Sequence, residues 1–339
     1  MKNAINIIKK MQKIEALLVC NSNMFVPTVL TEVLSNTDKK YIVISDTVSI
    51  TRFFDFLAIP NVIYREYGVK RRFDFVLEKR KLLTFVNQYE ISKLVFFHAE
   101  FGEMANWLIS KLSKKRIPIK YCKLYDSIPS IKAPLSLCAM KILLRQYLFW
   151  GQKMDIMLYD APFPSIPKSF FQKNAVETIE MPINSELIDF HLKDRLNLFG
   201  VKGKYILLTG TAVHNGWYKE SEYTTFINEL IETLGVKNVV SKCHPRYTDL
   251  YGLENELQQV PSFIPGNVLF SCFDYFIGLE STLLVEAAQA GKVSVSYLDW
   301  LCPIQSRRDI QHAFFENRLQ GKGNICFPKS MEEFVQIMQ

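Results

Sequence analysis

Short apolar runs alternate with segments of helical periodicity through the first 126 residues. The runs are rich in β-branched and aromatic residues, which predicts buried strands at 16–20, 41–45, 61–65, 94–98 and 119–126. Between them, apolar residues recur at helical spacing in segments 27–33, 72–89 and 103–114. Strands that alternate with helices in this way predict a doubly wound α/β sheet with parallel strands.

The same alternation returns from residue 204 onward. It predicts strands at 204–210, 236–242, 274–278 and 293–298, of which we expect the last to be the final strand of the chain. A helix over 221–235 should end at Gly235, because glycine favours the end of a helix. A second helix should be capped by Ser281 or Thr282 and end at Gly291.

The segment between these two halves breaks the pattern. It contains an apolar helix at 136–151, which carries Lys141 and Arg145, a short strand at 155–159 and a proline-rich connection. The helix is either buried between domains or lies in a membrane interface. We expect the chain to cross into a second domain near residues 180–200, which gives an acceptor-side domain at 1–185 and a nucleotide-sugar domain at 186–339.

The predicted architecture is α/β, with two Rossmann-like domains facing a central cleft. Ligands of open parallel sheets bind beyond the carboxyl ends of the strands. Three polar pairs of the second half fall at such ends, namely Gly210-Thr211, His244-Pro245 and Ser281-Thr282. We therefore expect them to line one rim of the cleft.

Composition narrows the class of protein only modestly. The chain has 339 residues, is 48% hydrophobic and carries a formal net charge of +7, which suits an anionic partner without choosing one. Its seven cysteines include no C-x-x-C pair, which disfavours a zinc site or a disulfide framework. We read no signal peptide and no apolar run long enough to span a bilayer, and expect a cytoplasmic protein.

A phosphate site is the chemistry that fits the strand-end residues. The helix start at Ser281 and Thr282 offers backbone N–H groups and hydroxyls, and His244 as an imidazolium would neutralise a phosphate. Lys242 and Arg246 would add positive charge. Each feature alone is more often structural, as a loop histidine or a helix cap. Neither a Walker A pattern nor G-x-G-x-x-G occurs, and no metal pattern is evident, so we expect no cofactor and no metal.

Three motifs in order, YILLTGT, SKCHPRYTD and YFIGLEST, carry a resemblance to a known family. They resemble bacterial sialyltransferases of the GT-B type, especially glycosyltransferase family 52, the lipooligosaccharide and capsule enzymes. The resemblance covers mainly residues 204–298. In the first half it is confined to KLYDS at 123–127, which looks like the start of an Asp-Asp-Gly motif.

The resemblance implies an inverting, metal-independent transfer from CMP-sialic acid. It implies that His244 contacts the CMP phosphate, that Ser281 and Thr282 bind it from the helix side, and that either Glu280 or Glu286 accepts from ribose or cytosine. The full set of expected donor-binding residues is Gly210, Thr211, Lys242, Pro245, Arg246, Glu280, Ser281, Thr282 and Glu286.

The sequence departs from the family where a catalytic aspartate is expected. Ala212, Val213, His214 and Asn215 stand in place of the family's aspartate segment, and Asp126 is followed by Ser127. The catalytic set is therefore His244 with a base chosen from Asp126, His214, Glu100 and Glu103, and Asp126 is preferred because it lies in the acceptor-side domain.

Three other functions fit the same features. A Kdo transferase would use the same His-Pro and Ser motifs, and a CDP-glycerol-dependent transferase pairs Lys-x-His-Pro with a similar helix start. A non-catalytic sugar-nucleotide binding protein is the third. For the transferase we expect a glycan or glycolipid acceptor, peripheral contact with the inner face of the cytoplasmic membrane, and no nucleic acid.

Overall fold

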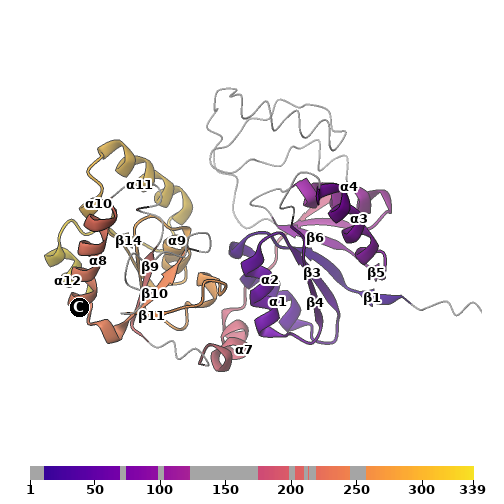
Figure 1. Cartoon of the computed structure of the whole chain (residues 1–339), viewed down its shortest axis with the longest axis horizontal. Coiled ribbons are helices and arrows are strands. Elements are labelled where there is room, and N and C mark those ends of the chain that lie inside the picture. The colour runs from indigo at the N-terminus through magenta and orange to yellow at the C-terminus, as the bar shows by residue number, and fades with distance from the viewer. Residues whose placement is uncertain are drawn as a thin grey trace, which may run out of the picture. The chain divides into compact units, whose positions relative to one another are not determined.

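A computed structural model describes residues 11–68, 74–97, 103–122, 175–197, 203–209, 213, 219–244 and 257–339. The chain divides into two compact units, Met1–Asn184 and Ser185–Gln339. Each unit is built around one six-stranded sheet in which all strands are parallel (Figure 1). The expected strand at 155–159 and helix at 136–151 lie outside the described residues.

The first unit has the strand order β4-β3-β2-β6-β7-β8. Its strands are β2 (Ala16–Val19), β3 (Tyr41–Ser45), β4 (Val62–Glu66), β6 (Leu94–Phe97), β7 (Ile119–Cys122) and β8 (Val176–Ile179). A separate parallel pair joins β1 (Gln12–Ile14) to β5 (Tyr89–Ile91). Every residue of β2, β3 and β6 is buried, as expected for strands covered by helices on both faces.

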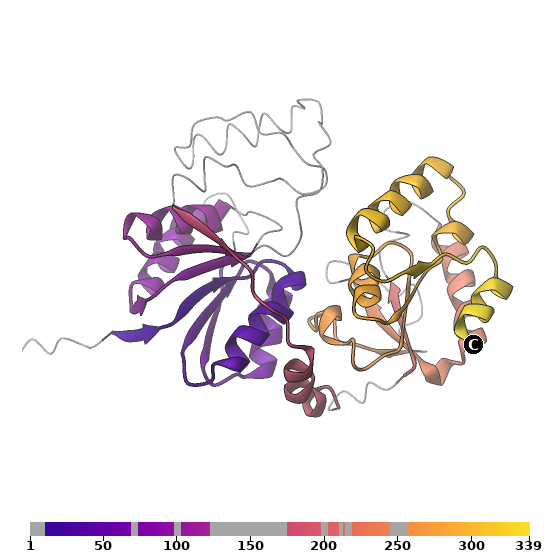
Figure 2. The ribbon, with the colours of Figure 1, turned by 180° about the vertical axis from the view of Figure 1, so that it is seen from behind.

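Helices cover both faces of this first sheet. A 3-10 turn at Asn23–Phe25 leads into α1 (Val26–Ser35), which lies with α2 (Val48–Leu57) on one face (Figures 1 and 2). On the other face, α3 (Asp74–Val86) and α4 (Glu103–Lys114) pack on the sheet through one hydrophobic core, to which Leu82, Leu108 and Leu112 contribute.

The second unit has the strand order β11-β10-β9-β12-β13-β14. Its strands are β9 (Tyr205–Thr209), β10 (Val239–Cys243), β11 (Gln258–Gln259), β12 (Tyr275–Gly278), β13 (Val293–Ser296) and β14 (Ile325–Cys326). Its helices are α7 (Ser185–Asn197), α8 (Glu220–Leu234), α9 (Thr282–Gln289), α10 (Leu298–Leu301), α11 (Gln305–Leu319) and α12 (Met331–Met338). Short 3-10 turns lie at Val236–Asn238 and Gly266–Val268.

Both sheets share one topology. If the strands of each sheet are counted along the chain, each runs 3-2-1-4-5-6 across the sheet, which is the Rossmann order. The order reverses between β2 and β6 in the first unit and between β9 and β12 in the second. The α/β class with two Rossmann-like units is therefore confirmed.

The expectation that 293–298 is the last strand is wrong. β14 follows it along the chain and pairs with β13 through Ser294 and Val295. β14 has only two residues, too few for an apolar pattern to show in the sequence. No helix in the described part of the chain has both the length and the hydropathy of a membrane span.

Candidate functional site

The carboxyl ends of β9, β10 and β12 carry the candidate site of the second unit. Strand order reverses between β9 and β12, and ligands of open α/β sheets bind at the carboxyl edge near such a reversal. Thr209 ends β9 and Gly278 ends β12. Glu280, Ser281 and Thr282 follow β12 directly, so three predicted residues lie beside this point of the sheet.

Ser281 is the N-cap of α9. Its backbone is extended, with φ −146° and ψ 131°, and its hydroxyl oxygen accepts a 3.2 Å hydrogen bond from the backbone N–H of Leu283. Thr282 is the first residue of the helix. This satisfies the expectation that one of the two hydroxyl residues caps the helix, and the start of α9 presents the positive end of its dipole at the strand edge.

Lys242 is a buried cation in β10. Its side chain is 5% exposed, and its ammonium nitrogen has no hydrogen-bond partner among the residues that the structure describes. Burial lowers the pKa of this ammonium group to about 8. Of the ionisable groups described, Cys243 alone acts against that shift, so no carboxylate compensates the buried charge. A lysine held in this way is complementary to an anion.

The neighbours of Lys242 across β9 and β12 are an apolar residue and a glycine. Lys242 is the register partner of Leu208 in β9. On the next strand, a Cβ added to Gly278 would lie 3.1 Å from the Leu208 Cβ, which places that glycine beside Leu208. These two neighbours therefore provide no polar side chain to the Lys242 ammonium group.

His244 follows β10 and has a fixed backbone. Its N–H donates a 3.1 Å hydrogen bond to the carbonyl oxygen of Thr209, which continues the pairing of β9 and β10 past the end of the strand. The side chain is half-buried. Because side chains alternate along extended chain, His244 and Lys242 project to the same side of the sheet.

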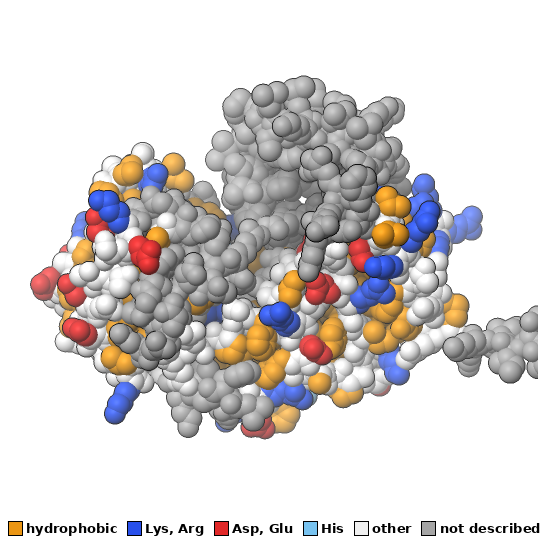
Figure 3. Space-filling model, in the orientation of Figure 1, with side chains coloured by type: hydrophobic (Ala, Val, Ile, Leu, Met, Phe, Trp, Pro, Cys, Tyr) orange, Lys and Arg blue, Asp and Glu red, His pale blue; other side chains and the backbone are white. Residues whose placement is uncertain are grey.

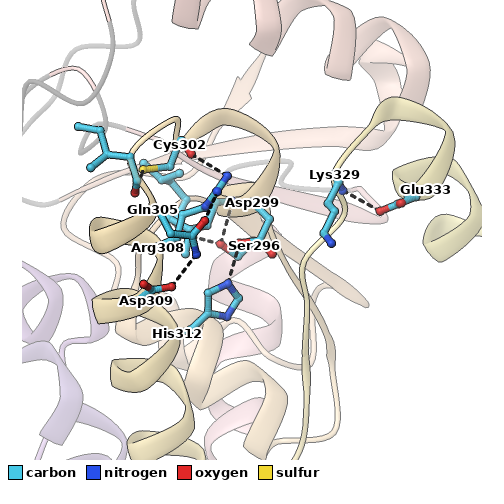
Figure 4. Close-up of polar contacts among 12 residues, drawn as sticks. Ser296, Asp299, Cys302, Gln305, Arg308, Asp309, His312, Lys329 and Glu333 are labelled. Atoms are coloured by element: carbon cyan, nitrogen blue, oxygen red, sulfur yellow. Dashed lines mark hydrogen bonds and ion pairs between the residues drawn. The ribbon is translucent and has the colours of Figure 1, made fainter.

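Helix α11 holds the loop that follows β12. The Gln311 side-chain amide donates a 2.9 Å hydrogen bond to the Glu280 carboxylate. The next residue, His312, has its Nε2 2.6 Å from an Asp299 carboxylate oxygen in α10 (Figure 4), and its ring lies 4.2 Å from that of Phe327. Of the residues in these contacts, only Glu280 was predicted from the sequence.

Glu286 lies within α9 and has partners inside the protein. Burial raises the pKa of its carboxyl group to about 7, while a hydrogen bond from Asn267 and the charge of Arg318 act in the opposite direction. These contacts are those of a carboxyl group held between α9, the Gly266–Val268 turn and α11. Its expected role in donor binding stays a prediction.

The remaining predicted residues are not described by the structure. They are Asp126, Gly210, Thr211, His214, Pro245 and Arg246, together with the alternative base Glu100. Glu103 begins α4, and its side chain is not described. In the described part of the chain, no three His, Cys, Asp or Glu side chains are grouped as metal ligands would be. Metal independence remains a prediction.

Comparisons with known proteins bear on the fold. No family model matches the chain, and no curated protein matches it significantly. The solved UDP-GlcNAc 2-epimerase from Methanocaldococcus jannaschii is similar, with 12% identity and a TM-score of 0.50 over 96% of this chain and 92% of that chain.

Two further solved structures superpose less closely. The wall teichoic acid polymerase TagF, soaked with CDPG, has 14% identity and a TM-score of 0.46 over 96% of this chain and 79% of that chain. The spinosyn rhamnosyltransferase SpnG, in complex with thymidine diphosphate, has 10% identity and a TM-score of 0.42, and the alignment covers 96% and 89% of the two chains.

The chain contains two parallel sheets in the Rossmann order, and it aligns with nearly all of the epimerase. It therefore has the GT-B fold. The GT-B class expected from the sequence is confirmed.

Proposed function

We propose that the protein is a glycosyltransferase that moves sialic acid from CMP-sialic acid to a hydroxyl of a bacterial lipooligosaccharide or capsule glycan. The observation that carries this proposal is the buried ammonium of Lys242, which has no hydrogen-bond partner within the described parts of the chain. It lies on the same side of the sheet as His244, at the carboxyl edge of the second unit. The motif resemblance selects the CMP-sugar donor among anionic ligands.

A donor phosphate would place an anion beside the buried ammonium group of Lys242. A buried charge without a counterion is costly, so an ammonium group in this state favours any ligand that brings an anion to it. Donation to a charged phosphate oxygen is stronger than a neutral hydrogen bond. His244 and the start of α9 would add donors from the neighbouring strand ends.

The proposed reaction is a single displacement. The acceptor oxygen attacks the anomeric carbon of sialic acid on the side opposite to CMP, and the carbon–oxygen bond to the phosphate breaks. The electron pair leaves with the phosphate of CMP, and a base removes the proton of the acceptor hydroxyl. Inversion follows from attack on the opposite side.

Lys242 and His244 stabilise the charge that develops on the departing phosphate. One well-placed donor of this kind contributes on the order of 3 kcal/mol to a transition state. Because cationic side chains supply this stabilisation, the proposal requires no metal. Asp126 and His214 are the proposed candidates for the base, since either can accept a proton near neutral pH when suitably placed.

A calorimetric titration with CMP, CDP and UDP tests the donor class. CMP should bind at micromolar to millimolar strength, and a chelator should leave the affinity unchanged. Transfer assays with CMP-sialic acid and CMP-Kdo then separate the two CMP-sugar reactions. Binding of UDP without binding of CMP would contradict the proposal, and CMP binding without transfer to any glycan acceptor would identify a non-catalytic binding protein.

A further inference from the structure

Helices α3 and α4 lie side by side on the same face of the first unit's sheet (Figures 1 and 2). Their inner sides are buried in the core. The Lys79 ammonium lies 5.3 Å from the centroid of the Trp107 ring and so links the two helices. Their outer sides therefore form one continuous surface.

This surface is strongly basic. Lysine and arginine side chains gather over α3 and α4 in Figure 3. We call it the α3–α4 basic surface, and its cations are Lys79, Arg80, Lys81, Lys111, Lys114, Lys115 and Arg116. Residues 74–86 and 103–116 take in the two helices and the two residues after α4, and their acidic residues are Asp74, Glu78 and Glu103. Glu78 pairs with Lys81 at 3.2 Å. Cations thus exceed acids by seven to three.

Two large apolar side chains border these cations. Val76 is 56% exposed and Leu77 is 57% exposed, both in the first turn of α3. They lie about one helical turn before Arg80 and Lys81, so they share the outer side of the helix with them. Single exposed apolar residues are ordinary, but an adjacent pair beside a basic surface is a feature of membrane-interface helices.

We propose that the α3–α4 basic surface docks on an anionic lipid membrane. The cations match the negative charge of anionic headgroups, and Val76 and Leu77 would enter the boundary between headgroups and acyl chains. A nucleic acid would also attract the cations, but its phosphate backbone offers nothing to two aliphatic side chains. The apolar pair therefore favours the lipid surface.

Docking would have a consequence for the acceptor. α3 follows β4, so its first turn lies toward the carboxyl edge of the first sheet, where ligands of parallel sheets bind. A membrane contact at Val76 and Leu77 would bring lipid-anchored molecules to that edge. This inference goes beyond the proposed transfer reaction and does not depend on which donor is used.

Flotation of the full chain with lipid vesicles tests the proposal. The protein should bind vesicles of phosphatidylcholine and phosphatidylglycerol in equal parts, and bind pure phosphatidylcholine far more weakly. A cation near an anionic membrane contributes about 1 kcal/mol, so Arg80→Gln with Lys111→Gln should lower the partition coefficient roughly 30-fold. Val76→Ser with Leu77→Ser should lower the binding that persists at high salt about tenfold.

Matched variants keep the test specific. Lys39→Gln with Lys40→Gln removes two exposed cations of the same unit outside these helices, and Ile310→Ser removes an exposed apolar residue of the other unit. Both should bind vesicles like the wild type. Failure of the wild type to bind the anionic vesicles, or an equal loss in the control variants, would overturn the proposal. So would duplex DNA or RNA binding that outcompetes the vesicles and depends on Arg80 and Lys111.

Discussion

The backbone N–H of His244 donates to the carbonyl oxygen of Thr209 at 3.1 Å, one residue beyond the strand that precedes it. This bond fixes the histidine at the carboxyl edge of the sheet through its main chain. The imidazole ring is therefore positioned without being needed for the hydrophobic core.

His244→Ala should consequently impair transfer and leave folding intact. If the imidazole supports the departing phosphate, kcat should fall roughly 100-fold, the scale of losing one acid or one key donor. Steady-state kinetics with CMP-sialic acid measures this effect, and a thermal melt of the variant checks the fold. Near wild-type turnover of the folded variant would show that His244 is a structural loop residue.

The proposed bases can be separated by comparing Asp126→Asn with His214→Gln. Loss of the general base should abolish most turnover without changing CMP affinity, because the base contacts the acceptor hydroxyl and not the nucleotide. We expect this behaviour from Asp126→Asn. If only His214→Gln behaves in this way, the base lies in the second unit instead.

The helix cap distinguishes the two hydroxyl residues at the start of α9. Ser281→Ala should lower the free energy of unfolding by about 1 kcal/mol, because the Leu283 N–H loses its acceptor. Thr282→Ala removes no cap and should change it by less than about 0.5 kcal/mol. Urea denaturation measures both values. Equal losses in the two variants would contradict the assignment of Ser281 as the cap.

Glu286 should make stability depend on pH. Its pKa is raised from 4.5 to about 7 in the folded protein, so the folded state holds this proton where the unfolded state has lost it. The resulting stabilisation is full below about pH 4.5 and disappears as pH rises to about 7. Above that range, Glu286→Gln should be more stable than the wild type by up to about 3 kcal/mol.

The control for that measurement is Glu232→Gln, an exposed position in α8. It should show no such pH-dependent gain. Denaturation curves at about pH 5 and about pH 8, roughly the two ends of this window, give the comparison. A Glu286→Gln variant whose advantage is the same at both values would rule out titration of this carboxyl group.

The sequence pattern predicted those elements whose local residue preference matches the structure that they adopt. β3 was expected at 41–45 and occupies Tyr41–Ser45, because a strand buried on both faces is a continuous apolar run. Helix α2 was missed, since Val48, Ile50 and Thr51 are β-branched and favour strands. Tertiary burial of Phe53 and Phe54 outweighs that local preference.

The site could be predicted only in part. The cap at Ser281 follows from local sequence, and so does the position of His244 after a strand. The contact of Gln311 with Glu280 joins residues far apart in the chain, and no local pattern signals it. The burial of Lys242 was equally hidden, because lysine is almost never fully buried without a partner.

Lys242→Met should stabilise the free protein while weakening donor binding. Burial lowers the pKa of the ammonium to about 8 from 10.5, so the charged form destabilises the fold below about pH 8, and this cost fades as pH rises toward 10.5. At neutral pH the variant should gain up to about 3 kcal/mol in the free energy of unfolding. Lys237→Met, at an exposed lysine, should gain nothing.

The affinity of CMP for wild type and Lys242→Met, measured by calorimetry at neutral pH, tests the central claim most directly. We predict at least about a tenfold loss in the variant, the scale of one hydrogen bond between charged groups. The wild-type affinity should also fall as pH rises above about 8, and the variant should lack this dependence. A Lys242→Met protein that binds CMP as tightly as the wild type would contradict the phosphate site.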